Sequence, residues 1–147
     1  MKTLFFSFLI FCFAFQASEK ISDKVVAYCL QNMGKQVDRG ECWDLASSAL
    51  KATKAKWKAP FDFGTPLDWK KKPLQAGDVL QFTDVKLYGK GYSMYFPQHT
   101  AIVYKCTKKD IVVFHQNYNN KRSVDTLTMH LADLKNGKID AYRPVAQ

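Results

Sequence analysis

Four residues of the 147-residue chain have side chains that could act together in nucleophilic chemistry: Cys42, His99, His115 and Asn117. Attack on a carbonyl by cysteine needs a thiolate, a base that accepts the thiol proton, and a group that orients this base. Cys42 can supply the thiolate, His99 the base, and His115 or Asn117 the orienting group. The sequence therefore indicates cysteine-based acyl chemistry, provided that the fold brings these distant positions together.

Cys42 is expected to begin a helix. It follows a loop over residues 35–41, and after it small or apolar residues such as Ala46, Ala49 and Leu50 recur at helical spacing. The unpaired N–H groups at a helix start favour a thiolate and can stabilise an oxyanion. On the residues alone, two other roles stay open: Cys42 could be a buried packing residue or one half of a disulfide.

His99 and His115 are expected on two neighbouring strands. Residues 99–105 and 111–117 both alternate in polarity, and residues 107–110 form the turn between them. A hairpin places the start of one strand beside the end of the other, so the two histidines can be neighbours. Alternation also predicts that His115 and Asn117 project from the same face. The third histidine, His130, is expected to be exposed to solvent.

The other elements complete an α+β pattern with an antiparallel sheet, because helices precede a run of strands. We expect a first helix over residues 23–33, with Ser22 as its N-cap and Gly34 as its stop. Further predicted elements are strands over residues 79–82, 124–129 and 139–142, a helical turn over 131–134, and irregular loops over 57–75 and 83–98.

The N-terminus has the pattern of a secretory signal. Lys2 precedes about a dozen apolar residues, too few for a membrane-spanning helix, which needs roughly 20. We predict a signal peptide over residues 1–17 with cleavage near Ala17, although a cut after Ala14 is also compatible, followed by one exported domain over residues 18–147. Three cysteines then remain, so in an oxidising compartment one thiol is reactive or simply buried.

Composition excludes several classes of protein. The chain is 47% hydrophobic and 14% aromatic, which excludes charge-driven disorder, and seven glycines with five prolines exclude a collagenous chain. The formal charge is +9, or +8 without the signal peptide. Such an excess fits either a well-solvated surface or attraction to an anionic polymer, cell wall or membrane surface. No nucleic-acid motif accompanies it.

Four segments in order resemble the motifs of CHAP domains, the cysteine, histidine-dependent amidohydrolases/peptidases related to NlpC-type cell-wall peptidases. They are GECWDLA at residues 40–46, QAGDVLQF at 75–82, HTAIVY at 99–104 and FHQNY at 114–118. No single segment is specific, but their order is, and the resemblance covers residues 25–145. It implies a papain-like fold with N-terminal helices packed on an antiparallel β-sheet.

The resemblance also implies roles for the residues. Cys42 matches the nucleophile and His99 the general base, whereas His115 stands where CHAP domains usually have glutamate. Asn117 matches the asparagine that these domains place two residues after that glutamate. Gln36 is a weaker match for an oxyanion donor. If Cys42 is the nucleophile, Cys29 and Cys106 could form a disulfide.

The function that the resemblance implies is that of a secreted, monomeric cysteine hydrolase that cleaves amide or peptide bonds in peptide or peptidoglycan-type substrates. It implies no cofactor, no metal and no nucleic acid. Two alternatives stay open: a catalytically inactive basic domain that binds an anionic wall or surface ligand, and acyl transfer by the same residues.

Overall fold

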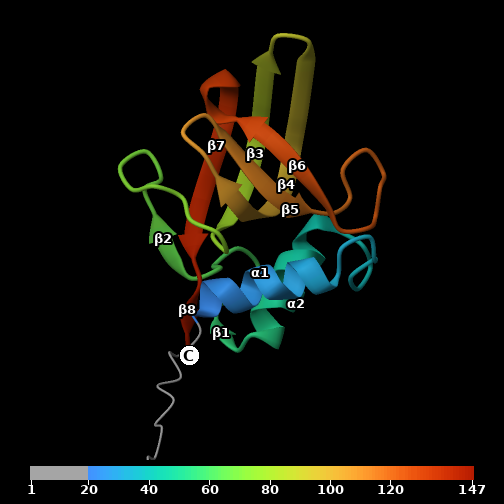
Figure 1. The fold of residues 1–147 in the computed structure, drawn as a ribbon, viewed down its shortest axis with the longest axis vertical. Helices are drawn as coiled ribbons and strands as arrows, with labels where there is room; N and C mark the ends of the chain where they lie inside the picture. Colours follow the sequence, from blue (N-terminus) through green and yellow to red (C-terminus); the bar gives the residue numbers. More distant parts are fainter. Residues whose placement is uncertain (1–19) are drawn as a thin grey trace, which may run out of the picture.

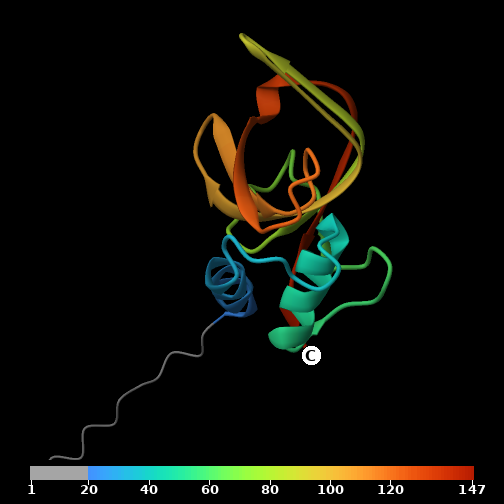
Figure 2. The ribbon, with the colours of Figure 1, turned by 90° about the vertical axis from the view of Figure 1, so that its right-hand side faces the viewer.

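Two helices lie side by side beneath a strongly curled antiparallel sheet in the computed structural model, which describes residues 20–147 (Figures 1 and 2). The predicted α+β class with helices packed on an antiparallel sheet is confirmed. The predicted signal peptide lies outside the described residues. Within residues 20–147, none of the helices has the length and apolar character needed to cross a membrane.

Helix α1 (Ile21–Gln31) begins earlier than the sequence predicts. Ser22 is not its N-cap: the backbone N–H groups of Asp23 and Lys24 donate to the carbonyl of Lys20, so the first turn is already closed there. The helix also ends earlier, because Asn32 closes it and Met33 leaves to form a parallel bridge with Val124. The four-residue spacing of Val25 and Cys29, both fully buried, turns one face of α1 toward the core.

Helix α2 (Cys42–Ala52) begins at the predicted residue. The backbone N–H of Glu41 donates to Oδ2 of Asp44 over 3.0 Å, an arrangement that stabilises a helix start. Leu45, Ala49 and Leu50 are buried beneath the sheet. This packing fixes α2, and with it Cys42, against the strands.

The main sheet has six antiparallel strands in the order β2-β7-β3-β4-β5-β6. Their bounds are β2 (Thr65–Leu67), β3 (Val79–Gly89), β4 (Tyr92–Cys106), β5 (Asp110–His115), β6 (Asp125–His130) and β7 (Leu134–Arg143). A separate pair, β1 (Ala55–Lys56) and β8 (Val145–Ala146), lies at the base, and the 3₁₀ turn η1 (Leu131–Asp133) matches the predicted helical turn.

The loop predicted over residues 83–98 is instead a long hairpin between β3 and β4, seen projecting at the top of Figure 1. Val85, Leu87 and Phe96 are buried within it. The alternation is hidden in the sequence because the ladder shifts register near Asp84, whose φ is +50°. The long loop predicted over residues 57–75 is correct except for the short strand β2.

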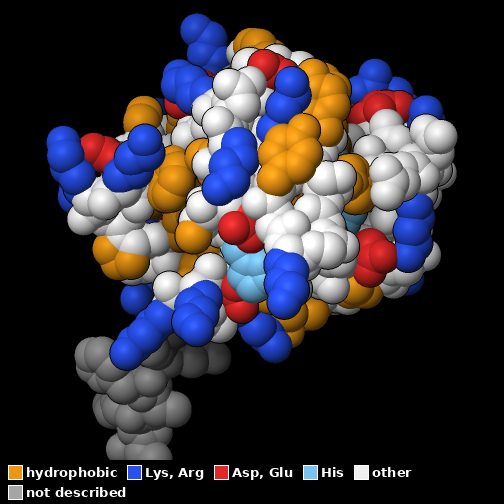
Figure 3. Space-filling view, turned by 90° about the horizontal axis from the view of Figure 1, so that it is seen from above, with side chains coloured by type: hydrophobic (Ala, Val, Ile, Leu, Met, Phe, Trp, Pro, Cys, Tyr) orange, Lys and Arg blue, Asp and Glu red, His pale blue; other side chains and the backbone are white. Residues whose placement is uncertain are grey.

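The sheet is buried on both faces. On one face, Val79, Ile102 and Phe114 pack against the helices. The opposite face, here called the concave face, encloses a second core that includes Phe82, Val103 and Val113 (Figure 2). Lys and Arg side chains are spread around the end of the molecule that lies away from the helices (Figure 3).

Candidate active site

Cys42 is held at the first turn of α2 by charged neighbours that neutralise one another. Asp44, which is fully buried, accepts a hydrogen bond from the Arg39 guanidinium over 2.6 Å as well as the backbone bond from Glu41. Oε1 of Glu41 pairs with Arg122 over 2.9 Å. The helix start is therefore anchored on both sides of the thiol, and sequence reasoning did not identify Asp44 or Arg122 in this role.

The Cys42 thiol is half-buried and faces strand β4. Burial raises its pKa above the ordinary value, and hydrogen bonds with the backbone and hydroxyl of Thr100 and the backbone of Trp43 offset only part of this effect. The neighbouring Glu41 carboxylate raises the pKa further. Desolvation of the thiol therefore outweighs the hydrogen bonds that favour the thiolate.

A cleft of about 650 Å³ opens beside the thiol. The loop after β1 forms one wall and the β3–β4 ladder forms the other. Its lining residues are Arg39, Glu41, Cys42, Trp43, Pro60, Phe61, Gln81, Gln98, His99 and Thr100. On the ladder side Thr100 donates to Oε1 of Gln81 over 2.7 Å, and Gln81 donates to Oε1 of Gln98 over 3.2 Å. The thiol thus faces a cleft with an ordered polar wall.

The imidazole of His99 lies on the concave face. Its ring is stacked on Phe82, with centroids 6.1 Å apart and planes 14° apart, and lies 5.1 Å from the ring of Phe96. Thr100 is the next residue along the strand, so it projects to the opposite face, toward Cys42. Among residues 20–147 no hydrogen bond joins the thiol to His99, and Nε2 of His99 is buried without a partner.

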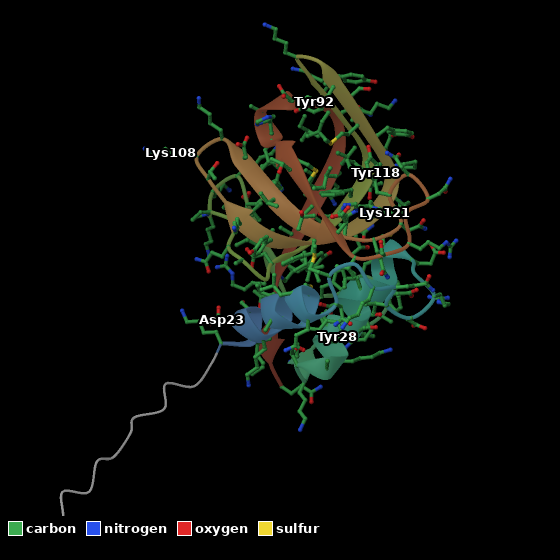
Figure 4. All side chains as sticks on the ribbon, turned by 45° about the vertical axis from the view of Figure 1, so that its right-hand side comes forward. Asp23, Tyr28, Tyr92, Lys108, Tyr118 and Lys121 are labelled. Atoms are coloured by element: carbon green, nitrogen blue, oxygen red, sulfur yellow. The ribbon has the colours of Figure 1, made fainter. Side chains whose placement is uncertain are left out.

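His115 lies beside His99, as the hairpin predicts. The two ring centroids are 5.5 Å apart, and Tyr118 packs against both rings. Figure 4 labels Tyr118 and Lys121 on the loop after β5, above the helices. Nδ1 of His115 is buried with no partner among the described residues. The structure therefore brings the two histidines together, and His99 also lines the cleft that contains Cys42, although no hydrogen bond within residues 20–147 joins its imidazole to the thiol.

Burial favours the neutral form of both imidazoles, and the neighbouring His115 adds to this effect at His99. The pKa of His99 is lowered from its ordinary 6.5 to about 3, first by burial and then by the neighbouring His115. The pKa of His115 is also lowered by burial, an effect that Asp125 opposes and Lys121 reinforces. At neutral pH the pair is uncharged, so either ring could accept a proton if it reached a donor.

These shifted pKa values predict loss of stability in acid. Between about pH 3 and pH 6.5 the unfolded chain binds a proton at His99 that the folded chain does not, so stability falls as the pH falls through this window. From pH 8 to pH 5, His99 alone should lower the free energy of unfolding by about 2 kcal/mol, and His115 should add to the loss. Urea unfolding at the two pH values measures this, and equal stability at both would contradict it.

Asn117 does not project with His115, contrary to the prediction. Strand β5 ends at His115, and Asn117 has a φ of +58°, which turns the chain away. Its side-chain amide donates to Oε2 of Glu41 over 2.5 Å. Asn117 therefore supports the residue before Cys42 and does not orient an imidazole in this structure.

Gln116, which sequence reasoning did not single out, makes the most extensive contact with the segment before Cys42. It is fully buried, its Oε1 accepts from the N–H of Val37 over 3.2 Å, and its Nε2 donates to the carbonyls of Val37 and Glu41 over 3.0 and 2.8 Å. A glutamine beside a strand end gives only a weak sequence signal for such a role. The one indication is alternation along the strand, which places Gln116 on the same face as Phe114, toward the helices and opposite His115.

The remaining candidates do not reach the thiol. Gln36 donates to the carbonyl of Asp38 and is not among the lining residues of the cleft, so the structure assigns it no oxyanion role. The Cys29–Cys106 disulfide hypothesis is wrong: both thiols are free, with Cys29 buried on α1 and Cys106 exposed at the end of β4. His130 is half-exposed, as predicted, and pairs with Asp110.

A metal centre has no support within residues 20–147. No group of three or more His, Cys, Asp or Glu side chains is arranged there to hold an ion. The chemistry that this part of the chain offers is that of the thiol and of the neutral histidine pair.

Comparisons with known proteins place the fold among cysteine proteinases. Two crystal structures of Ly7917, one with the hydrolyzing product of MDP, resemble the chain with a TM-score of 0.56 at 18% identity. The matches cover 84% and 82% of this chain and 62% of each Ly7917 chain. At this identity the likeness shows the fold alone, and it confirms the papain-like architecture.

A curated relative and a family model complete the comparison. Altered inheritance of mitochondria protein 3 of the yeast Debaryomyces hansenii is 29% identical over 154 aligned positions, which cover 86% of this chain but only 16% of that protein. The model of the AIM3/BBC1 cysteine proteinase-fold domain matches residues 15–147. The chain therefore belongs to the AIM3/BBC1 cysteine proteinase-fold domain family.

Proposed function

We propose that the chain is an exported cysteine hydrolase of CHAP/NlpC type that cleaves amide bonds in peptide or peptidoglycan material. The observation that carries this proposal is a nucleophile at a helix start, facing a cleft whose opposite wall includes the strand segment around His99. The cysteine proteinase fold of the family and the ordered CHAP-like motifs support it. So does the likeness to Ly7917, which in one of its crystal structures holds the hydrolyzing product of MDP.

Catalysis by these residues needs one local movement. The imidazole of His99 must leave Phe82 and Phe96 and turn toward the thiol, which lies beside the next residue, Thr100. Contacts in a resting enzyme are often looser than those in the complex with substrate. Once there, neutral His99 can take the thiol proton, and its pKa rises as it leaves the buried face.

The reaction then follows the general course of thiol hydrolysis. The thiolate forms a bond with the substrate carbonyl carbon, and the N–H groups at the start of α2 stabilise the oxyanion. The C–N bond breaks as protonated His99 returns its proton to the leaving amine. Water then attacks the thioester, and the acid leaves as the thiol is restored. An amine in place of water would give acyl transfer by the same steps.

Substituting Cys42 by alanine tests the proposal. The C42A variant should lose all amide hydrolysis, since Cys42 is the one thiol among the described residues that line the cleft. The matched control is C106A, because Cys106 is a free, exposed thiol far from the cleft. Digestion of peptidoglycan and of its peptide stems, followed by mass spectrometry, measures the products. Hydrolysis by C42A at the wild-type rate would overturn the proposal.

A catalytically inactive domain that binds a wall or surface ligand is the second candidate, and the orientation of His99 favours it. The thiol has a raised pKa, and no hydrogen bond within residues 20–147 joins it to the imidazole of His99, which is stacked on Phe82. This function predicts that wild type and C42A bind peptidoglycan equally and that neither digests it. Sedimentation of the protein with wall material, measured beside the digestion assay, separates the two functions.

A further inference from the structure

The cleft beside Cys42 has few charged lining residues, although the chain as a whole is strongly basic. Among its ten lining residues only two are charged, and both are engaged: Arg39 with buried Asp44, and Glu41 with Arg122 and Asn117. None of the lining residues is a lysine. Lys and Arg side chains are spread over the end of the molecule seen in Figure 3, away from the helices. The excess positive charge of the protein is therefore not concentrated in the lining of the cleft.

One wall of the cleft is a prearranged aromatic surface. Nε1 of Trp43 donates to the carbonyl of Pro60 over 2.5 Å, which ties the loop carrying Phe61 to the start of α2. Trp43 rests on Trp57, with ring centroids 5.9 Å apart, and Phe61 rests on fully buried Phe63, with centroids 6.3 Å apart. Phe61 is nevertheless 44% exposed. Phe61 therefore packs against the core and also lines the cleft.

The opposite wall leaves one hydrogen-bond donor available. Gln81 is fully used, since its Oε1 accepts from Thr100 and its Nε2 donates to Gln98 and to the carbonyl of Phe82. Gln98 uses its Oε1 in this chain, and its amide nitrogen has no partner among residues 20–147. A carbonyl of a bound chain could accept from it. The cleft thus combines an apolar wall, a neutral donor and a thiol.

We propose that this cleft selects a substrate with an uncharged, aromatic-sized side chain next to the amide carbonyl that Cys42 attacks. The inference rests on the hydrolase function proposed above and concerns its peptide substrates, so the digestion assay includes a peptide with an aromatic residue before the scissile bond. An apolar side chain that covers Trp43 and Phe61 removes exposed apolar surface from water, whereas a charged group on this wall would lose hydration, and the one cationic lining residue, Arg39, is already paired with Asp44. The overall positive charge would then attract the protein to an anionic polymer or surface and would not determine which substrate it cleaves.

Three alkylating probes test the selectivity without requiring turnover: iodoacetamide, N-benzyl-iodoacetamide and iodoacetate. Site-resolved mass spectrometry gives the labelling rate of Cys42, and exposed Cys106 in the same molecule is the reference thiol. For each thiol, the labelling rate with N-benzyl-iodoacetamide is divided by the rate with iodoacetamide. We expect this ratio to be about tenfold higher at Cys42 than at Cys106. The labelling rate with iodoacetate, divided by that with iodoacetamide, should be no higher at Cys42 than at Cys106.

Two variants show whether the aromatic wall is responsible. F61A should remove most of the benzyl preference at Cys42. The control Y88A removes an aromatic side chain that is 52% exposed on β3, outside the cleft, and should leave the preference unchanged. Equal preference at Cys42 and Cys106, or faster labelling of Cys42 by iodoacetate, would overturn the inference.

The labelling result and the hydrolysis result can fail separately. A wild-type protein that keeps the benzyl preference but digests neither peptidoglycan nor a peptide with an aromatic residue before the scissile bond supports the selectivity of the cleft and overturns the proposed hydrolase. A protein that digests amides with no preference at Cys42 supports the hydrolase and overturns the selectivity.

Discussion

Replacing His99 with leucine is expected to abolish amide hydrolysis while leaving the fold at least as stable as the wild type. Loss of a general base costs up to about 10⁴-fold in rate, so the H99L variant should fall below detection in a digestion assay. The stability expectation has a separate cause. Nε2 of His99 is buried against Phe82 and Phe96 without a partner, and an apolar side chain suits that position better.

The control for this experiment is H130Q, which replaces a half-exposed histidine outside the cleft. It should keep the wild-type rate of hydrolysis. Initial rates on a peptide-stem substrate and urea unfolding at pH 8 supply the two readouts. Unchanged hydrolysis by H99L would remove His99 as the base. A loss of several kcal/mol of stability would mean that the imidazole makes a favourable contact within the concave face.

H99L also tests the acid sensitivity of the fold. Because the lowered pKa of His99 makes it a source of instability below pH 6.5, the variant should lose that part of the decline between pH 8 and pH 5. The part that remains belongs largely to His115, whose pKa is also lowered. A position that weakens the fold in acid and leaves a polar atom unpaired is one that selection for stability alone would not retain.

The sequence predicted which elements meet, but not which face of the sheet each side chain takes. Helical spacing after Cys42 and the turn before Asp110 were enough to place the thiol at a helix start and His99 beside His115. Alternation along residues 99–105 cannot say whether His99 or Thr100 faces the helices. Both faces of this sheet are buried, so apolar residues occur at odd and even positions alike.

Other differences have equally local causes. The register shift near Asp84 hid a long hairpin, and the end of β5 at His115 turned Asn117 away from its predicted partner. The Cys29–Cys106 disulfide was predicted only because these two cysteines remain when Cys42 is the nucleophile. In the structure Cys29 packs beneath the sheet and Cys106 lies exposed at the end of a strand. Such features depend on backbone geometry and burial, which cannot be predicted from the spacing of residues in the sequence.

Replacing Gln116 with alanine is expected to produce the largest loss of stability of any single substitution near the site. The side chain is fully buried and makes three hydrogen bonds to the backbone of Val37 and Glu41. Without it, the buried backbone groups on this segment lose their partners, and a cavity is left. Because each buried unsatisfied group costs about 1–3 kcal/mol, Q116A should lose about 3–5 kcal/mol in urea unfolding.

The same substitution should also weaken the site, because Glu41 is the N-cap of α2 and directly precedes Cys42. The control Q31A removes an exposed glutamine from α1 and should change stability by less than about 0.5 kcal/mol. Q116E keeps the acceptor for Val37 but replaces the two donated bonds with repulsion between oxygens, so it should be no more stable than Q116A. Wild-type stability in Q116A would mean that this glutamine does not hold the segment before Cys42.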